Sequence, residues 1–239
     1  NGTAWTWMGG SSVDDQPGVY GTKGVASPTN YPGGRSYAAA VVGSDGKVRI
    51  FGGWGYAATG SGYLNDLWTW DGTSWTWVSG SDGPSQPGVY GTKGVAAPGN
   101  VPGARSSASS WVDSTGRFFL LGGGSRSGAP SSDAQTFGDV WMWDGAAWTW
   151  VGGASTSDAP GVFGTKGVPA AANVPGARSG ARALADVSGG VFLFGGNGAS
   201  ATGDIGGLND LWRWNGTEWT WLSGTDGTSL VGVYGTKGT

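Results

Sequence analysis

The residues that could carry chemistry in this chain recur at a regular interval. The string Gly-Val-Tyr-Gly-Thr-Lys-Gly occupies residues 18–24, 88–94 and 232–238, and a variant with Phe in place of Tyr occupies 161–167. The Lys and the aromatic residue could form a repeated ligand contact; alternatively, the Lys could donate to carbonyls while the ring anchors a long loop on the core. We favour loop anchoring, because the Phe variant dispenses with the hydroxyl. The residues concerned are Tyr20, Lys23, Tyr90, Lys93, Phe163, Lys166, Tyr234 and Lys237.

One Arg and one Asp recur with the same interval. They are Arg35 and Asp66, Arg105 and Asp139, and Arg178 and Asp210. A buried charge needs a partner, and the guanidinium fork can donate two parallel hydrogen bonds to a carboxylate. We therefore expect three structural ion pairs, each beside a Gly-Gly sequence; a catalytic Asp is the minor alternative.

The composition excludes most catalytic chemistry. The chain has 239 residues, of which 51 are Gly and 16 are Trp, and it contains no His and no Cys. Sites that need an imidazole or a thiolate cannot form in it, so carboxylate, Lys or Tyr chemistry is all that remains for an enzyme. Glu218 is the single Glu, and no paired carboxylates recur at a spacing typical of acid–base catalysis. We expect no catalytic residues, no metal site and no cofactor.

Charge and hydropathy limit the partners. The net charge is −3, and no basic cluster is present, which argues against nucleic-acid binding. No apolar run has the length of a membrane span.

Four short strands per repeat would hold these residues, giving an all-β protein. The period is about 71 residues. In the first complete repeat the strands are predicted at residues 36–42, 47–51, 66–70 and 75–78, joined by Gly-rich turns. A long polar loop is expected between the second and third strands, and the Lys string lies in a longer loop after the fourth. Each repeat would form a four-stranded antiparallel sheet.

The tryptophans follow the strand pattern. Two alternate on the third strand and two on the fourth, so closing the hairpin places all four on one face of the sheet. We expect these quartets to pack in the core; platforms for stacking sugars are the alternative. Trp54 and Trp111 lie outside the scheme and are better candidates for a surface contact. The quartets are Trp68, Trp70, Trp75 and Trp77; Trp141, Trp143, Trp148 and Trp150; and Trp212, Trp214, Trp219 and Trp221.

Together these markers resemble the kelch repeat. The resemblance rests on an Arg that opens the first strand, an apolar run ending in Gly-Gly, an Asp-Leu-Trp and a later Trp; the longer string and Asn-Val-Pro-Gly-Ala-Arg are similar to a bacterial secreted subgroup described as galactose-oxidase-like. It covers the whole chain and implies kelch-type β-propeller blades. It implies no oxidase activity, because the copper of galactose oxidase is held by His and Tyr and this chain has no His.

The repeats predict the domain organisation. Residues 1–34 would hold the fourth strand of a preceding blade, at 4–8, with its loop; residues 35–104, 105–177 and 178–239 would each hold one blade with its loop. Propellers usually need about four to eight blades to close. We therefore expect self-association of this chain, or further blades in a longer parent chain, to cover the end faces.

The favoured function is a non-catalytic repeat scaffold, extracellular or on the cell surface, that acts through assembly and through loop contacts with a protein or a surface. A carbohydrate-binding, lectin-like propeller is the alternative, and an enzyme is the least favoured class.

Overall fold

The structure, a computed structural model, describes residues 2–126, 135–186 and 189–236. These residues form 16 β-strands. They contain no helix, and hence none long and apolar enough to cross a membrane. The all-β class and the antiparallel sheets of the prediction are confirmed.

Sheet 1 follows the first loop. It has five antiparallel strands, with β1 and β2 both paired to β3, and then β4 and β5 in order. The strands are β1 (Arg35–Ser36), β2 (Ala39–Val42), β3 (Val48–Tyr56), β4 (Ser61–Trp70) and β5 (Trp75–Ser79).

Sheet 2 has four strands in the order β11–β10–β7–β6, and a separate pair, β8 with β9, lies next to it in the chain. The strands are β6 (Ser109–Val112), β7 (Phe118–Leu121), β8 (Gly124–Ser125), β9 (Gln135–Thr136), β10 (Val140–Trp143) and β11 (Trp148–Gly152).

Sheet 3 repeats the pairing of Sheet 1, with β12 and β13 both paired to β14, followed by β15 and β16. The strands are β12 (Arg178–Ser179), β13 (Arg182–Ala185), β14 (Val191–Ala199), β15 (Ile205–Trp214) and β16 (Trp219–Ser223).

Three strand predictions need correction. The first strand, expected at 36–42, is interrupted because Tyr37 adopts a left-handed backbone with φ of 56°. The expected long loop after residue 51 is wrong for Sheet 1, since β3 and β4 continue as a hairpin beyond Gly52 and Gly53. These glycines have φ of 63° and 100° at a register shift, a conformation that suits residues without a Cβ.

The expected strand at residues 4–8 is also absent. Trp5 is fully exposed and Trp7 is 70% exposed. A strand needs a neighbour to satisfy its backbone groups, and none of the described strands pairs with this segment.

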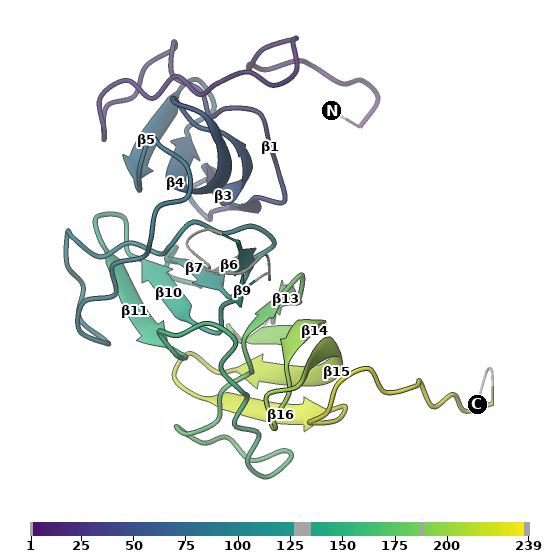
Figure 1. The fold of residues 1–239 in the computed structure, drawn as a ribbon. Helices are drawn as coiled ribbons and strands as arrows, with labels where there is room; N and C mark the ends of the chain where they lie inside the picture. The colour runs from purple at the N-terminus through teal and green to yellow at the C-terminus, as the bar shows by residue number, and fades with distance from the viewer. Residues whose placement is uncertain (1, 127–134, 187–188, 237–239) are drawn as a thin grey trace.

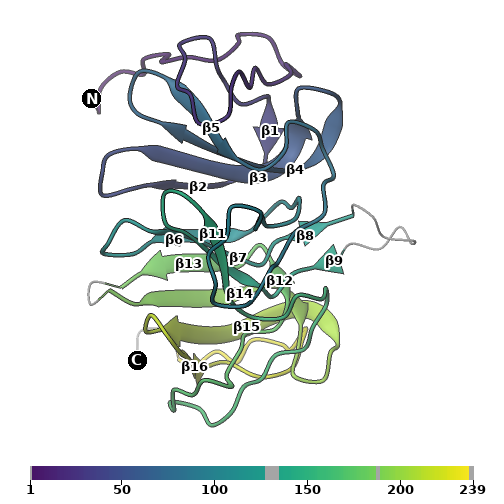
Figure 2. The ribbon, with the colours of Figure 1, turned by 90° about the vertical axis from the view of Figure 1, so that its left-hand side faces the viewer.

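The three sheets stack one on another (Figures 1 and 2). Each has a Trp face, which carries the paired indoles, and an opposite face. The opposite face of Sheet 1 packs on the Trp face of Sheet 2, where the Phe51 and Trp148 rings lie 5.6 Å apart. The opposite face of Sheet 2 packs in the same way on the Trp face of Sheet 3. The fold therefore contains two equivalent sheet junctions.

Candidate functional site

The recurring Arg and Asp residues meet at the start of each sheet. In Sheet 2, Arg105 donates from both terminal nitrogens to Asp139, with Nη2 2.8 Å from Oδ2. Two further donors are also used, because Nε donates to the Gly103 carbonyl and Nη1 to the Gly122 carbonyl, each at 2.9 Å. Burial lowers the pKa of Arg105, but the charge of Asp139, the hydrogen bonds to it and the nearby Tyr90 together outweigh burial, and the net shift is upward. The guanidinium therefore stays charged.

The same pair forms in the other two sheets. Both partners are essentially solvent-free in Sheets 2 and 3, and the Arg is slightly exposed in Sheet 1. The pairs are Arg35 with Asp66, Arg105 with Asp139, and Arg178 with Asp210. The predicted ion pairs are confirmed.

In Sheets 1 and 2 the Asp also fixes a tyrosine from the preceding loop. The Tyr20 hydroxyl donates to Asp66 Oδ2 at 2.6 Å, and the Trp68 indole donates to the same oxygen at 2.7 Å. Tyr90 and Trp141 do the same on Asp139. Burial, followed by the charge of the neighbouring carboxylate, raises the pKa of both tyrosines.

Phe163 has no hydroxyl, yet its ring takes the corresponding place in Sheet 3. Its centroid lies 4.9 Å from Trp212 and 5.0 Å from Trp221. In Sheet 1, Tyr20 lies 4.8 Å from Trp68 and 5.0 Å from Trp77. Ring packing therefore holds the loop in all three sheets, and the hydroxyl adds a hydrogen bond in two.

The Lys residues of the strings lie at the edge of the same contact. Lys23 donates to the Gly80 carbonyl at 2.7 Å, and its Nζ lies 4.2 Å from the centroid of the Trp77 ring. Lys93 and Lys166 contact a carbonyl and a Trp in the same way. These are the contacts that loop anchoring requires; whether the strings also touch a ligand stays a prediction.

The fourth string follows Sheet 3, and its described residues are exposed. Tyr234 is 92% exposed and Val233 is 98% exposed. Lys237 lies outside the described residues. The same sequence is thus ordered on a core in three places and extended in the fourth, so the docking surface, rather than the string, determines its conformation.

A buried Asn in each loop escaped the sequence reasoning. The Asn100 amide donates to the Val95 carbonyl at 2.9 Å and to the Trp148 carbonyl at 3.0 Å, and so ties the loop to β11. Asn30 and Asn173 make the same pair of contacts. Their fixed place before a Pro two residues later was the available signal.

The Trp quartets of Sheets 2 and 3 lie at the two sheet junctions, and the quartet of Sheet 1 lies on a face that no other described sheet covers. The predicted cross-strand pairs, such as Trp68 opposite Trp77 and Trp70 opposite Trp75, are confirmed. Buried members are Trp68, Trp141, Trp143, Trp148, Trp212, Trp214 and Trp219. Half-buried members are Trp70, Trp75, Trp77, Trp150 and Trp221.

Trp111, expected at the surface, is buried. It is 4% exposed and stacks on Phe119, with centroids 5.2 Å apart and the planes 5° from parallel. It belongs to the opposite face of Sheet 2, which Sheet 3 covers. Trp54 is 46% exposed, in agreement with the expectation.

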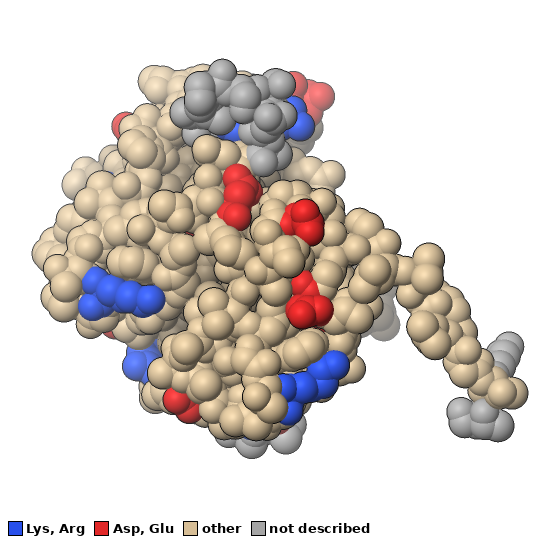
Figure 3. Space-filling view, turned by 60° about the horizontal axis from the view of Figure 1, so that its bottom comes forward, with Lys and Arg blue, Asp and Glu red and all other residues tan. Residues whose placement is uncertain are grey.

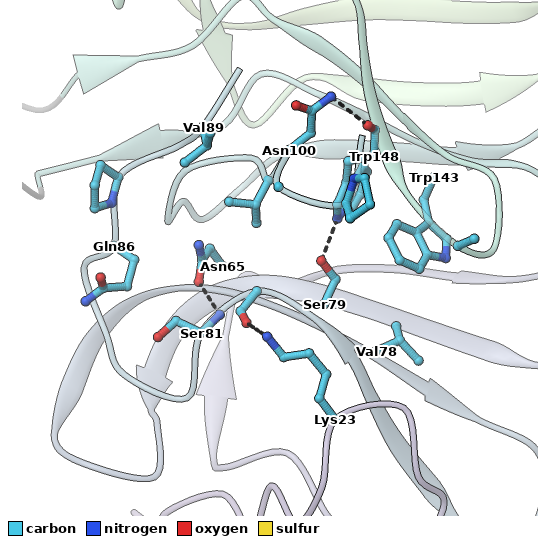
Figure 4. Close-up of a pocket in the computed structure, with 16 residues that line it drawn as sticks. Lys23, Asn65, Val78, Ser79, Ser81, Gln86, Val89, Asn100, Trp143 and Trp148 are labelled. Carbon is cyan, nitrogen blue, oxygen red and sulfur yellow. Dashed lines mark hydrogen bonds between the residues drawn. The ribbon is translucent and has the colours of Figure 1, made fainter. Parts of the chain in front are cut away.

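A cleft opens at the first sheet junction (Figure 4). Its volume is about 450 Å³. Side chains that line it include Lys23, Asn65, Gln86, Asn100 and Trp148. Several are already used within the protein, since the Asn65 carbonyl oxygen accepts from the Ser81 amide and the Asn100 amide is bound as described.

The recurring carboxylates are buried and engaged in hydrogen bonds within the protein. Asp66 Oδ2 accepts from Arg35, Tyr20 and Trp68, and Oδ1 accepts from Arg35. In the described part of the chain, no three acidic side chains come together in a group suited to a metal ion. Three further ion pairs within the described ranges lie nearer the surface, and the face seen in Figure 3 is largely uncharged.

Comparison with known proteins finds remote structural similarity only. The sequence matches no family profile and no curated protein. Among solved structures, one titled "Structure of YjhT" is 14% identical, with a TM-score of 0.47, over 82% of this chain and 48% of that chain. A protein of unknown function from Dyadobacter fermentans DSM 18053 is 11% identical, with a TM-score of 0.43, over 78% of this chain and 53% of that one. This chain spans about half the length of each.

Proposed function

We propose that this chain is a non-catalytic repeat scaffold of kelch-type β-propeller blades that acts outside the bacterial cell. It works through assembly of its sheets and through contacts of its loops with a protein or a surface. The order of strands within each sheet, the two equivalent junctions and the sequence markers support the blade assignment.

One observation carries the proposal. The charged and aromatic residues that recur in every repeat serve the same internal purpose in each sheet: an Arg–Asp pair, a ring on the Trp face and a Lys on a carbonyl fix the long loop. The Arg and Asp side chains face one another inside each sheet, and each Lys, although exposed, is held by a carbonyl and a Trp ring. These residues position loops, and the loop surfaces are what a partner would meet.

Substitution of Lys93 tests this proposal. Lys93→Met should increase protease cleavage within residues 80–104 and lower the unfolding temperature, because the loop loses its carbonyl and ring contacts. Lys47→Met is the matched control, since Lys47 is exposed in a turn of Sheet 1 and belongs to no string. If Lys93→Met left loop protection unchanged but removed binding to a glycan, the string would be a ligand contact and the scaffold proposal would fail.

Carbohydrate binding is the second candidate, and the cleft at the first junction favours it. The cleft combines the amides of Asn65 and Gln86 with Trp143 and Trp148 in its wall, groups that suit a sugar. Glycan-array binding that is lost in Gln86→Ala, with unchanged stability, would support this candidate. Binding to no glycan would exclude it.

A further inference from the structure

Among the described residues, Sheets 1 and 3 each leave one broad face without a neighbouring sheet. We define the head face as the Trp face of Sheet 1, including Val42, Trp70 and Trp75. We define the tail face as the opposite face of Sheet 3, including Leu184 and Phe194. Figure 2 shows the two sheets at the two ends of the stack.

The tail face has the residues of a sheet junction. Phe194 is 53% exposed, whereas Phe51 and Leu121, at the same position of Sheets 1 and 2, are 1% and 2% exposed. Leu184 is 66% exposed, and its counterpart Trp111 is 4% exposed. Where another sheet follows, the position of Phe194 is buried in both cases, and the position of Leu184 is buried in Sheet 2 and half-buried, as Val41, in Sheet 1.

The head face is the complementary half of such a junction. Trp70 and Trp75 are half-buried, while Trp143 and Trp148, at the same positions of Sheet 2, are buried beneath Sheet 1. Val42 is 67% exposed.

Backbone hydrogen bonds set the register of both internal junctions. At the first, Gly53 N donates to the Arg105 carbonyl at 2.9 Å, and Arg105 N donates to the Leu64 carbonyl at 3.0 Å. Ser107 N also donates to the Tyr37 carbonyl, at 2.8 Å.

The second junction repeats all three bonds one repeat further along. Gly123 N donates to Arg178, Arg178 N to Phe137, and Gly180 N to Ser107. A junction is therefore a fixed pattern of donors and acceptors as well as an apolar contact.

We propose that a second copy of this chain docks its head face on the tail face in this same register. Gly196 N would donate to the carbonyl of Arg35 in the second copy, whose Arg35 N would donate to the Leu208 carbonyl. Tyr37 N of the second copy would donate to the Gly180 carbonyl. Such a contact is heterologous, so it continues into a ring or an open stack according to the rotation.

A second copy fits better than an unrelated partner, because both halves of the junction are on one chain. The first junction supplies a further match: the Trp148 indole donates to Ser79 Oγ at 3.1 Å. At the new junction these positions are held by Trp75 of the second copy and by Ser223. At the new junction Gly180 would contact Tyr37 of the second copy, which takes the position that Ser107 and Gly180 have at the two internal junctions. Gly180 is exposed, with no atom near the place of a Cβ, and so leaves room for this larger side chain.

The first residues of the chain partly cover the head face. Trp7 and Met8 line an apolar pocket together with Trp70 and Trp75. Residues 5–7 have the sequence Trp-Thr-Trp, as β16 does. They therefore resemble β16 of the sheet that would dock on this face. Docking displaces this segment, and its removal should strengthen association.

Two arginines on the tail face favour a different interpretation, in which this face is a polar cap exposed to water. Arg182 is exposed where the internal junctions have Ala39 and Ser109, and Arg213 pairs with Asp186 at 2.8 Å. A polar cap would keep this face in water. In the docked register Arg182 instead takes the place of Ser109, whose hydroxyl donates to the Ala181 carbonyl at 2.9 Å. Arg182 would thus donate to the Ala38 carbonyl of the second copy.

Cysteine cross-linking tests the register, since the chain contains no Cys. A mixture of Tyr37→Cys and Gly180→Cys chains should form a disulfide between copies on mild oxidation. The control is Tyr37→Cys with Ser107→Cys in one chain, which should close within the chain because the two backbones are hydrogen-bonded. If the control closed but the mixture did not link beyond the level of either single variant, the register would be wrong.

Sedimentation velocity over a concentration series tests the contact itself. The wild type should associate, deletion of residues 1–8 should strengthen association, and Phe194→Glu should weaken it by about tenfold or more. Ile205→Glu is the matched control. Ile205 is also 53% exposed in Sheet 3, and its counterpart Ser61 stays exposed beside a junction.

If the wild type and the variant without residues 1–8 both stayed monomeric, the inference would be overturned. The tail face would then be a polar cap. Equal effects of Phe194→Glu and Ile205→Glu would also overturn it. The inference deepens the proposed assembly by naming its partner. Its failure is distinguishable from failure of the scaffold proposal, which is tested separately on Lys93 and its loop.

Discussion

Replacing Asp139 by Asn should expose how much the fold depends on its buried ion pairs. The Asp139 carboxylate is solvent-free and accepts from both terminal nitrogens of Arg105, from the Tyr90 hydroxyl and from the Trp141 indole. Asn has almost the same shape but no charge, and one of its two polar atoms is a donor. The substitution therefore leaves the buried guanidinium of Arg105 without its counter-charge. It also places the Asn amide N–H groups opposite groups that are themselves hydrogen-bond donors.

The expected loss is about 3–5 kcal/mol, as for other buried pairs that lose one partner. A domain is stable by about 5–15 kcal/mol, so Asp139→Asn should remove a large part of the free energy of unfolding. The matched control is Asp113→Asn, which breaks a more exposed pair with Arg117 in the same repeat. Its expected cost is about 1 kcal/mol, since exposed ion pairs contribute little.

Urea unfolding followed by tryptophan fluorescence measures both values, and unchanged m-values would show that compactness is unaffected. The double variant Arg105→Met, Asp139→Leu should recover part of the loss, because no charge is then left buried. Equal, small losses of unfolding free energy for Asp139→Asn and Asp113→Asn would refute the reasoning. They would mean that the charge of Asp139 adds nothing to the stability that an uncharged side chain of the same shape provides.

Three further outcomes are expected. Because the pKa values of Tyr20 and Tyr90 are raised in the fold, the stability they contribute is present below pH about 10 and lost as the pH rises further; a melting-temperature series should show a shallower alkaline loss in Tyr90→Phe. Trp143→Ala should destabilise by about 3–5 kcal/mol in calorimetry and Trp54→Ala hardly at all, because only Trp143 is buried. Incubation with copper and galactose should give no oxidation, since no His is available to hold the metal; peroxide formation would contradict the non-catalytic proposal.

Much of the site could be predicted from spacing alone. The Arg–Asp pairs followed from their shared period, since a buried charge at a fixed place in a repeat requires a partner at another fixed place. The Trp pairs followed from the alternation of side chains along a strand and from the position of one turn. Both predictions depend on spacing and strand alternation, which can be taken directly from the sequence.

The remaining features depend on neighbours that local patterns do not encode. Trp111 is buried only because Sheet 3 lies over it, and residues 4–8 form no strand because no described strand lies beside them to pair with. The hairpin beyond Gly52 could not be predicted, because a Gly-Gly pair is also typical of the end of a strand. Here it produces a bulge, after which the ladder resumes.

The repeats also allow the fold's requirements to be separated from those of a ligand. Where all three sheets hold the same residue in the same contact, as with the Arg–Asp pair, the fold accounts for it fully. The cleft at the first junction behaves differently: Asn65 and Gln86 are replaced at the second junction by Gly138 and Ala159, although the backbone contacts there are the same. The fold does not need those amides. A ligand held by them would bind once per chain, whereas a ligand held by the Lys strings would bind at each docked loop, so binding stoichiometry distinguishes a single specific site from a repeated surface.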